Sequence, residues 1–366
     1  MNSPGADVIR SHHALRGVAA VLVLLYHFRD VTPSVGQAID SHTVFFSDGR
    51  IWVDFFFILS GFILSHVYGA AMSAKGVKVH ATRRFYLARF ARIYPLHFAT
   101  LLAMIAVELS AYVLRPEIAD AFASDRKSWG SILQHLTLTH AWLTMDRLEW
   151  NVPSWSISTE AFAYLAFPLL LLLSDHGRWA VRALLPIAAM TIYVHTFANF
   201  SDIGDQQPLA RCMAGFIAGM LLHRLWRQRR ARVASVATLL QVAAMAVAIA
   251  ALHLGWSQAV ILFALALLIL STADDRGPVA RVLMSPPLLL LGTLSYSLYM
   301  THWIFYRLYW MYGGYVFSGL AGSYSPIKVY ALKVFLLVAL TFALSYFTYR
   351  RIELPARWHL NRLLAR

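Results

Sequence analysis

Long apolar stretches recur along the whole chain and are separated by short polar segments. Each has roughly twenty residues, the length that an α-helix needs to cross about 30 Å of hydrocarbon. They lie at about 15–32, 51–69, 93–113, 154–173, 183–198, 208–226, 234–253, 256–272, 287–309 and 328–349. The pattern predicts an all-α polytopic membrane protein with about ten transmembrane helices in one bundle. The loops are too short for a separate domain, so we expect residues 1–366 to form one integral membrane unit.

An eleventh stretch, from Trp129 to Met145, is less apolar because Gln134, His135 and other polar residues interrupt it. The distribution of Lys and Arg decides whether it crosses, since cytoplasmic loops carry an excess of both. If it does not cross, 22 of the 32 Lys and Arg residues fall on one side of the membrane. We therefore expect both termini in the cytoplasm and 129–147 to be an interfacial or re-entrant segment on the outer side.

Composition agrees with a membrane protein and argues against several other classes. Of the 366 residues, 59% are hydrophobic and 14% are charged, and the mean hydropathy is +0.57, whereas soluble domains are nearer half apolar and a quarter charged. The net charge is +14, which in so apolar a chain favours loops facing anionic lipid over nucleic-acid binding. The single Cys212 excludes a disulfide framework, and no histidines have further ligands at suitable spacing, so we expect no metal site.

Ionisable side chains inside the predicted spans are costly, so they are candidates for a functional site. Arg16 and His27 are eleven positions apart, which places them on one face of the first helix with a rise of roughly 16 Å between them. Arg16 then lies near the cytoplasmic surface and His27 in the outer half. The alternative is a topogenic arginine and an unrelated core histidine.

Further polar groups are expected at the same outer depth as His27. Asp54 precedes three phenylalanines and needs a partner, for which His27 is the natural candidate. The others are Glu160 after the predicted helix start at Pro153 and Ser154, Arg211, and a stripe of Tyr296, Tyr299 and His302 at i, i+3 and i+6. A purely structural ion pair between Glu160 and Arg211 is the alternative explanation.

A basic segment precedes the third predicted span on the cytoplasmic side. Its run RRFYLARFARIYP contains Arg83, Arg84, Arg89 and Arg92, interleaved with aromatic residues. Guanidinium groups bind phosphates in bidentate fashion and aromatic rings can stack on a nucleobase. The segment therefore predicts either a nucleotide-binding loop or an anchor for lipid headgroups.

Several runs of residues, taken in order, resemble the acyltransferase-3 family of integral membrane O-acyltransferases. They are Arg16 with His27, WVDFFFILSGF, RRFYLARFARIYPLH, PSWSISTEAFAYLAFPLL, LGTLSYSLYMTHW and RIELPARW, and they cover about residues 10–358. The resemblance implies a ten-helix enzyme of the bacterial inner membrane. Such enzymes take an acyl group, commonly acetyl, from cytoplasmic acyl-coenzyme A and pass it to a carbohydrate hydroxyl at or beyond the outer side. It implies no permanently bound cofactor, and this chain resembles the type that lacks an SGNH hydrolase-like domain.

The resemblance also assigns roles to residues. Arg16, Arg89 and Arg92 match the family's coenzyme A-binding positions, and His27 and Glu160 match its first-helix histidine and its tryptophan-serine glutamate. We hypothesise that His27, oriented by Asp54 or Glu160, is the general base, since an ordinary histidine pKa of about 6.5 suits that role. A transient acyl-histidine is a variant of this mechanism. Arg211, Tyr299 or His302 are further candidates, with an arginine or tyrosine able to stabilise the oxyanion.

Two other classes of membrane protein remain open. A secondary transporter or flippase of a lipid-linked sugar also gathers charged residues near the midplane, but it would have matching broken helices in its two halves. A membrane glycosyltransferase would have an acidic motif in an outer loop, whereas the acidic residues of these loops are scattered. The sequence gives no indication of the acceptor's identity or of the oligomeric state.

Overall fold

The computed structural model describes residues 8–73, 79–114, 130–142, 149–176, 207–228, 234–320 and 324–364. This part of the chain is helical and contains no β-sheet, which confirms the all-α class. Its elements are α1 (Arg10–Phe28), η1 (Arg29–Val31), α2 (Pro33–Asp40), α3 (Ile51–Ser73), α4 (Val79–Leu114), α6 (Ser131–Leu136), α7 (Ser154–His176), α9 (Pro208–Gln228), α10 (Ala234–Leu254), α11 (Gln258–Thr272), α12 (Pro278–Leu283), α13 (Pro286–Phe317), η2 (Ser318–Leu320), α14 (Pro326–Thr348), the π-helical turn η3 (Tyr349–Glu353) and α15 (Leu354–Leu364).

Each predicted span coincides with a helix, except 183–198, which lies outside the described residues. Six helical runs are both long and apolar enough to cross a membrane: 51–72, 79–114, 154–173, 236–254, 286–320 and 326–360. These runs make the chain a multi-pass membrane protein, whereas the total of about ten spans stays a prediction. The short helix α6 has only six residues, so its part of the doubtful 129–147 segment does not cross.

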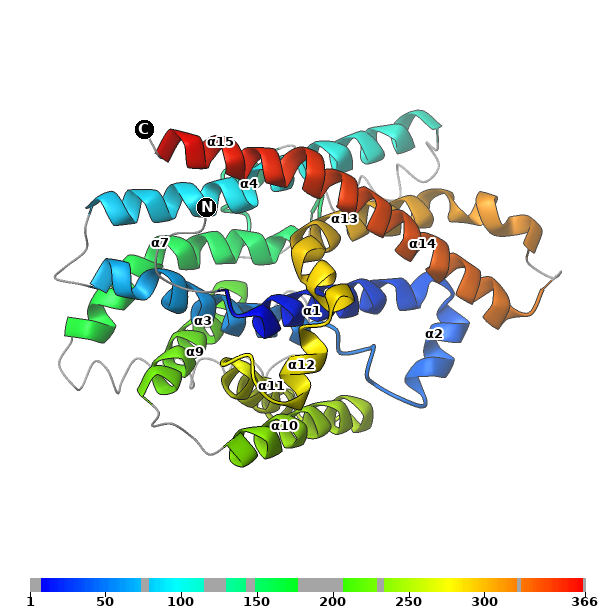
Figure 1. Ribbon diagram of the computed structural model, residues 1–366. Helices are drawn as coiled ribbons and strands as arrows, with labels where there is room; N and C mark the ends of the chain where they lie inside the picture. The colour runs from blue at the N-terminus through cyan, green and yellow to red at the C-terminus, as the bar shows by residue number, and fades with distance from the viewer. Residues whose placement is uncertain are drawn as a thin grey trace.

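Glycines allow the central helices to approach one another closely. Helix α1 packs mainly against α13, and α3 packs mainly against α9 (Figure 1). A Cβ atom on Gly17 of α1 would lie 2.3 Å from the backbone nitrogen of Gly292 in α13. A Cβ atom on Gly61 of α3 would lie only 1.9 Å from a carbonyl oxygen of α9. Small residues at helix crossings are typical of membrane bundles, and Gly17 and Gly61 have this role here.

The basic run before the third predicted span belongs to a helix, not to a loop. Helix α4 continues without a break from Val79 to Leu114 and contains Pro95. No glycine or proline precedes Pro95 within the helix, so nothing in the run interrupts the helical hydrogen bonds before that point. Arg89 and Arg92, three residues apart, therefore project from nearly the same face toward the bundle interior.

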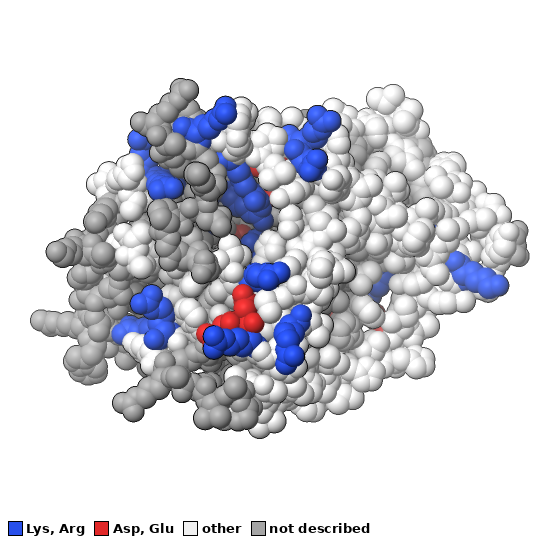
Figure 2. Space-filling view, in the orientation of Figure 1, with Lys and Arg blue, Asp and Glu red and all other residues white. Residues whose placement is uncertain are grey.

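Charged side chains are distributed unevenly over the surface. On the face shown in Figure 2, most Lys and Arg side chains lie on the left half, and the right half is nearly uncharged. In Figure 1 the left side is where α4 begins and α15 ends. Lys and Arg therefore gather at one end of this face, whereas their cytoplasmic location stays a prediction.

The segment 130–142 packs over the first turns of α7. The backbone nitrogen of Ala141 donates to Ser158 Oγ at 3.1 Å, and Ser158 Oγ donates to the carbonyl of Leu138 at 2.7 Å. Two imidazoles of this segment, His135 and His140, stack with ring centroids 3.8 Å apart. Burial lowers the pKa of His135 to about 3 and that of His140 well below its usual range, so both rings are neutral at pH 7.

Candidate active site

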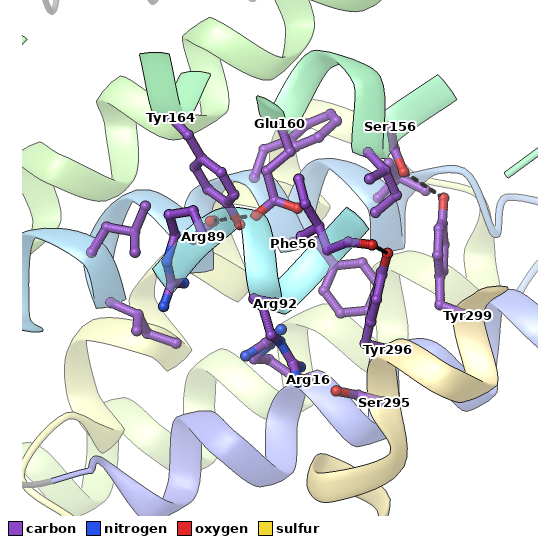
Figure 3. A pocket seen from close by; sticks show the side chains of 17 residues that line it. Arg16, Phe56, Arg89, Arg92, Ser156, Glu160, Tyr164, Ser295, Tyr296 and Tyr299 are labelled. Atoms are coloured by element: carbon purple, nitrogen blue, oxygen red, sulfur yellow. Dashed lines mark hydrogen bonds between the residues drawn. The ribbon is translucent and has the colours of Figure 1, made fainter. Parts of the chain in front are cut away.

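Five helices, α1, α3, α4, α7 and α13, line a pocket of about 720 Å³, a volume that includes space open to solvent (Figure 3). Five of the predicted site residues line it: Arg16, Arg89, Arg92, Glu160 and Tyr299. Its polar lining consists of Arg16, Ser60, Arg89, Arg92, Ser156, Glu160, Tyr164, Ser295, Tyr296 and Tyr299. The remaining lining is apolar and comes mostly from α3, including Phe56 and Phe57.

Three guanidinium groups point into the pocket and differ in how they are held. Arg89 donates from Nη2 to the hydroxyl of Tyr68 at 3.2 Å and lies over that ring. Arg92 donates from Nη1 to Glu353 Oε2 at 2.7 Å. Arg16 forms no hydrogen bond or ion pair with any described residue, although it lines the pocket. The pocket therefore presents at least one cation that is available to an anionic ligand.

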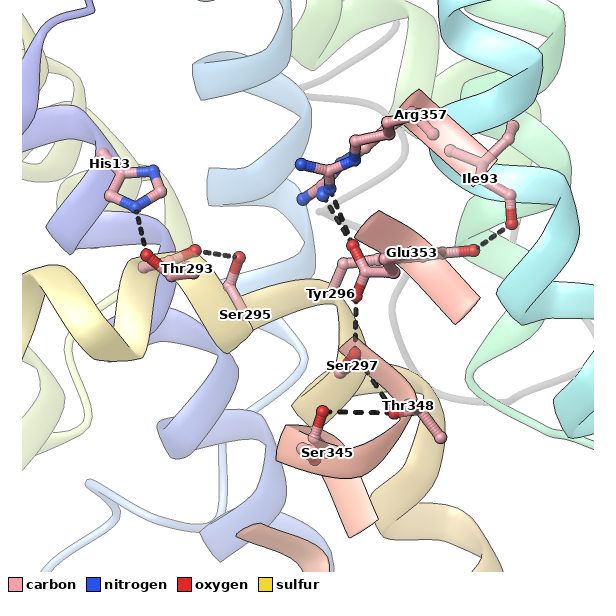
Figure 4. A network of polar contacts seen from close by, with 12 residues as sticks. His13, Ile93, Thr293, Ser295, Tyr296, Ser297, Ser345, Thr348, Glu353 and Arg357 are labelled. Carbon is pink, nitrogen blue, oxygen red and sulfur yellow. Dashed lines mark hydrogen bonds and ion pairs between the residues drawn. The ribbon is translucent and has the colours of Figure 1, made fainter. Parts of the chain in front are cut away.

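Glu353 connects the pocket to the C-terminal helix, and the sequence analysis missed it. Its carboxylate is 1% exposed and accepts hydrogen bonds from Arg92, Arg357 and Ser297, the first two at 2.7 Å (Figure 4). It lies in η3, a π-helical turn at the end of the last apolar helix. Such π-helical turns occur frequently at functional sites. A lone carboxylate at the end of an apolar span, in the run RIELP, was the available signal.

Glu160 faces the three arginines from α7. Helix α7 begins at Ser154, directly after Pro153, as predicted, and Glu160 lies less than two turns further on. Ser60 of α3 donates its hydroxyl proton to Glu160 Oε1 at 2.6 Å. This contact makes Ser60 a polar partner of Glu160 in the pocket wall.

Two tyrosines of α13 form one wall of the pocket and fix that helix to its neighbours. Tyr296 donates its hydroxyl proton to the carbonyl of Ile93 at 2.5 Å. Tyr299 donates to the carbonyl of Pro153 at 3.0 Å and lies 2.8 Å from the hydroxyl of Ser156. Because the proton of Tyr299 is already engaged, the structure favours a role in positioning over the predicted role in oxyanion stabilisation.

His27 does not line the pocket and is connected to it through His302. Its Nδ1 is 3.0 Å from the carbonyl of Val23 and 3.1 Å from Nε2 of His302. Nδ1 of His302 is in turn 3.2 Å from the carbonyl of Leu298. The His302 ring lies 6.0 Å from the ring of Tyr299, which lines the pocket.

The contacts of the two histidines assign their tautomers. Carbonyl oxygens only accept hydrogen bonds, so Nδ1 carries the proton in both rings. His302 Nε2 is then a bare acceptor, and the Nδ1–H of His27 is shared between it and Val23. Nε2 of His27 carries a lone pair and forms no hydrogen bond with the described residues. His27 therefore has a free basic nitrogen, oriented by His302.

Asp54 does not orient His27, in contrast to the expectation from sequence. It forms a two-pronged ion pair with Arg211, with 3.2 Å between Oδ1 and Nε and 2.7 Å between Oδ2 and Nη2. Both side chains are essentially inaccessible, at 1% and 0% exposure. The reason is the packing of α3 on α9, which brings the carboxylate to the helix that carries Arg211 and not to α1. The alternative pairing of Arg211 with Glu160 is not what the structure shows.

Comparisons with known proteins identify the family. A family model described as an acyltransferase domain matches residues 10–350. Acyltransferase MdmB of Streptomyces mycarofaciens is 34% identical over 161 residues, which are 42% of this chain and 37% of that protein. Protein 2 in picA locus of Rhizobium radiobacter is 46% identical over 63 residues, which are 17% of this chain and 31% of that protein.

The matched segments thus span about a third of each of these two relatives. No solved structure matches the chain. The family match, in contrast, extends through all five helices that enclose the pocket and includes both histidines. This chain carries an acyltransferase domain and belongs to the acyltransferase-3 family.

Proposed function

We propose that this protein is a membrane O-acyltransferase that uses acyl-coenzyme A, with acetyl as the expected acyl group. The acceptor is a hydroxyl of a carbohydrate or glycolipid, of the surface polysaccharide, O-antigen or exopolysaccharide type. The observation that carries the proposal is a pocket in which Arg16, without a polar partner among the described residues, lies beside Arg89 and Arg92. It is joined through Tyr299 and His302 to His27, whose Nε2 forms no hydrogen bond with those residues. Family membership supports the transfer of an acyl group.

The arginines support an anionic donor. Phosphate groups bind guanidinium groups through two parallel hydrogen bonds, and coenzyme A carries several phosphates. Arg16 and Arg89 have no carboxylate partner among the described residues, so a bound phosphate would not have to displace one. Arg92 is held in place by Glu353, so its positive charge can act on the same phosphates without rearrangement.

His27 supports the transfer step. It lies eleven residues after Arg16 on α1, which is a rise of about 16 Å along the helix. An extended donor bound by its phosphates near Arg16 can therefore direct its acyl end toward His27. In the proposed reaction the acceptor oxygen bonds to the acyl carbon, and the carbon–sulfur bond breaks. The hydroxyl proton passes to Nε2 of His27 and then to the leaving thiolate.

His302 replaces the carboxylate that the sequence suggested as the orienting group. A neutral imidazole can fix the His27 tautomer, but it stabilises an imidazolium less than a carboxylate would. Glu160 is the remaining predicted acidic residue of the site, and its place among the arginines supports a role in arranging them. The donor side in the cytoplasm and the acceptor side beyond the membrane follow the predicted topology.

Transfer of radiolabel tests the proposal. The purified protein is reconstituted in vesicles that contain the glycolipid fraction of its own cells and is supplied with radiolabelled acetyl-coenzyme A. We expect label on the glycolipid, and a loss of about 10²–10⁴-fold in rate for His27→Ala. The exposed His253 on α10 provides a control, and His253→Ala should transfer at the normal rate. Near-normal transfer by His27→Ala would overturn the role of His27. Movement of the glycolipid across the vesicle membrane without label would favour a flippase.

A further inference from the structure

The free nitrogen of His27 lies beside a group of aromatic rings that the proposed donor site does not use. The ring of His27 is 5.1 Å from that of Trp303, at an angle of 82°, and 6.0 Å from that of Tyr306. Trp303 and Tyr306 are 4.8 Å apart and inclined by only 34°. Both are partly exposed, so the two rings form a nearly continuous aromatic surface at a steep angle to the imidazole.

Burial distinguishes these rings from the aromatic residues that anchor proteins at a membrane interface. Anchoring rings face lipid and headgroups. Tyr315 of the same helix is 64% exposed and is suited to that role. Trp303 and Tyr306 lie closer to the interior, and Tyr306 also stacks on the buried Phe28. Their position is therefore fixed by contacts around His27.

A cluster of charged groups follows His27 closely in the chain, in η1. Arg29 Nε is 3.3 Å from Asp30 Oδ1 and 3.2 Å from Asp40 Oδ2. The Asp30 side chain is 45% exposed, and Asp40 Oδ1 is buried with no hydrogen-bond partner among the described residues. The guanidinium of Arg29 lies over the ring of Tyr26, at 5.1 Å, and that ring is 4.8 Å from the ring of His27. The half-exposed carboxylate of Asp30 can accept a hydrogen bond from a hydroxyl group.

We propose that Trp303 and Tyr306 form the subsite for the acceptor, and that its occupant is a pyranose ring. One face of a pyranose presents C–H groups that pack on an aromatic surface, while its rim presents hydroxyls. A ring packed on Trp303 brings one hydroxyl to Nε2 of His27 and leaves others free to reach the carboxylate of Asp30, three residues further along the chain. This inference rests on the proposed function and adds which residues hold the acceptor.

Variants of Trp303 test this subsite in living cells and in vitro. Acylation of cell-surface glycans is measured by mass spectrometry in cells that carry the wild-type chain, Trp303→Leu, Trp303→Phe or the control Tyr315→Leu. Binding of coenzyme A to each purified protein is measured by calorimetry. We expect Trp303→Leu to lower glycan acylation at least tenfold and to leave coenzyme A affinity within twofold. Trp303→Phe should recover most of the acylation, and Tyr315→Leu should behave as the wild type.

The remaining outcomes overturn the inference. Normal acylation by Trp303→Leu would show that the ring holds no acceptor. Equal losses in Trp303→Leu, Trp303→Phe and Tyr315→Leu, or a parallel loss of coenzyme A binding, would show a structural or interfacial role. The proposed function itself is tested by the wild-type cells. If the wild-type chain leaves every surface glycan unmodified, both the proposed function and this inference are wrong.

Discussion

Replacing Arg211 by methionine should strongly destabilise the protein, because it leaves the carboxylate of Asp54 buried without its partner. Both groups are withdrawn from solvent, at 0% and 1% exposure, and the pair is two-pronged. Breaking such a buried pair by removing one partner costs about 3–5 kcal/mol. The guanidinium also lies over the ring of Trp155, at 5.5 Å, and this contact is lost as well.

The double variant Asp54→Leu/Arg211→Met separates a structural pair from a catalytic one. Replacing both partners by apolar groups removes the unpaired charge, so we expect most of the stability to return. The coupling energy between the two positions should then be about 2 kcal/mol or more. The half-exposed Asp30 provides a control, since Asp30→Asn should change stability by less than about 1 kcal/mol.

Unfolding in detergent micelles, titrated with a denaturant and followed by circular dichroism, measures these free energies. A coupling energy near zero would refute the reasoning, because it would mean that the two charges are stabilised independently. Acyl transfer by the same proteins gives a second test. A double variant that is folded and stable but inactive would show that Asp54 takes part in the chemistry, against the structural role that its position indicates.

Four further predictions concern the pocket, the helix packing and the outer segment. Arg16→Ala should weaken coenzyme A binding by roughly tenfold or more in calorimetry, because one charge-assisted contact is worth about 1.5–3 kcal/mol. Glu353→Gln should raise the KM for acyl-coenzyme A more than it lowers kcat, because it frees the arginine that the carboxylate orients; an unchanged KM would contradict this. Gly61→Ala should lower the yield of folded protein, whereas Gly69→Ala, with nothing within 4 Å, should not. Thermal stability should fall as the pH drops below 6.5. In the unfolded chain His135 binds a proton near that pH, whereas burial lowers its pKa to about 3 in the folded protein. His135→Phe should reduce that fall.

The positions of the helices followed from the sequence, but the partners of their polar groups did not. Apolar length located α3 and α9, and depth placed Asp54 and Arg211 in the same half of the bundle. Depth alone does not specify which helices are neighbours, and Asp54 was therefore assigned to His27. The crossing at Gly61, which brings α3 against α9, decides the pairing.

Helix periodicity predicted a shared face for Arg16 and His27; in the structure Arg16 lines the pocket and His27 does not. Periodicity could not show that His302 supplies the partner of His27, because that contact joins residues 275 positions apart. Glu353 was missed for a related reason. Its importance comes from two arginines that converge on it, one from α4 and one from α15, and a single sequence does not reveal such a convergence.

Arg16, which has no polar partner among the described residues, adds unfavourable electrostatic energy to the pocket when no donor is bound. A guanidinium beside two others, with only part of their charge balanced, repels its neighbours until an anion arrives. A ligand that binds only the folded state stabilises it by about 2.7 kcal/mol at a hundred times its dissociation constant. The donor should therefore act as a thermal stabiliser of the bundle, and the Arg16→Ala protein, relieved of that repulsion, should melt higher than the wild type when no donor is present.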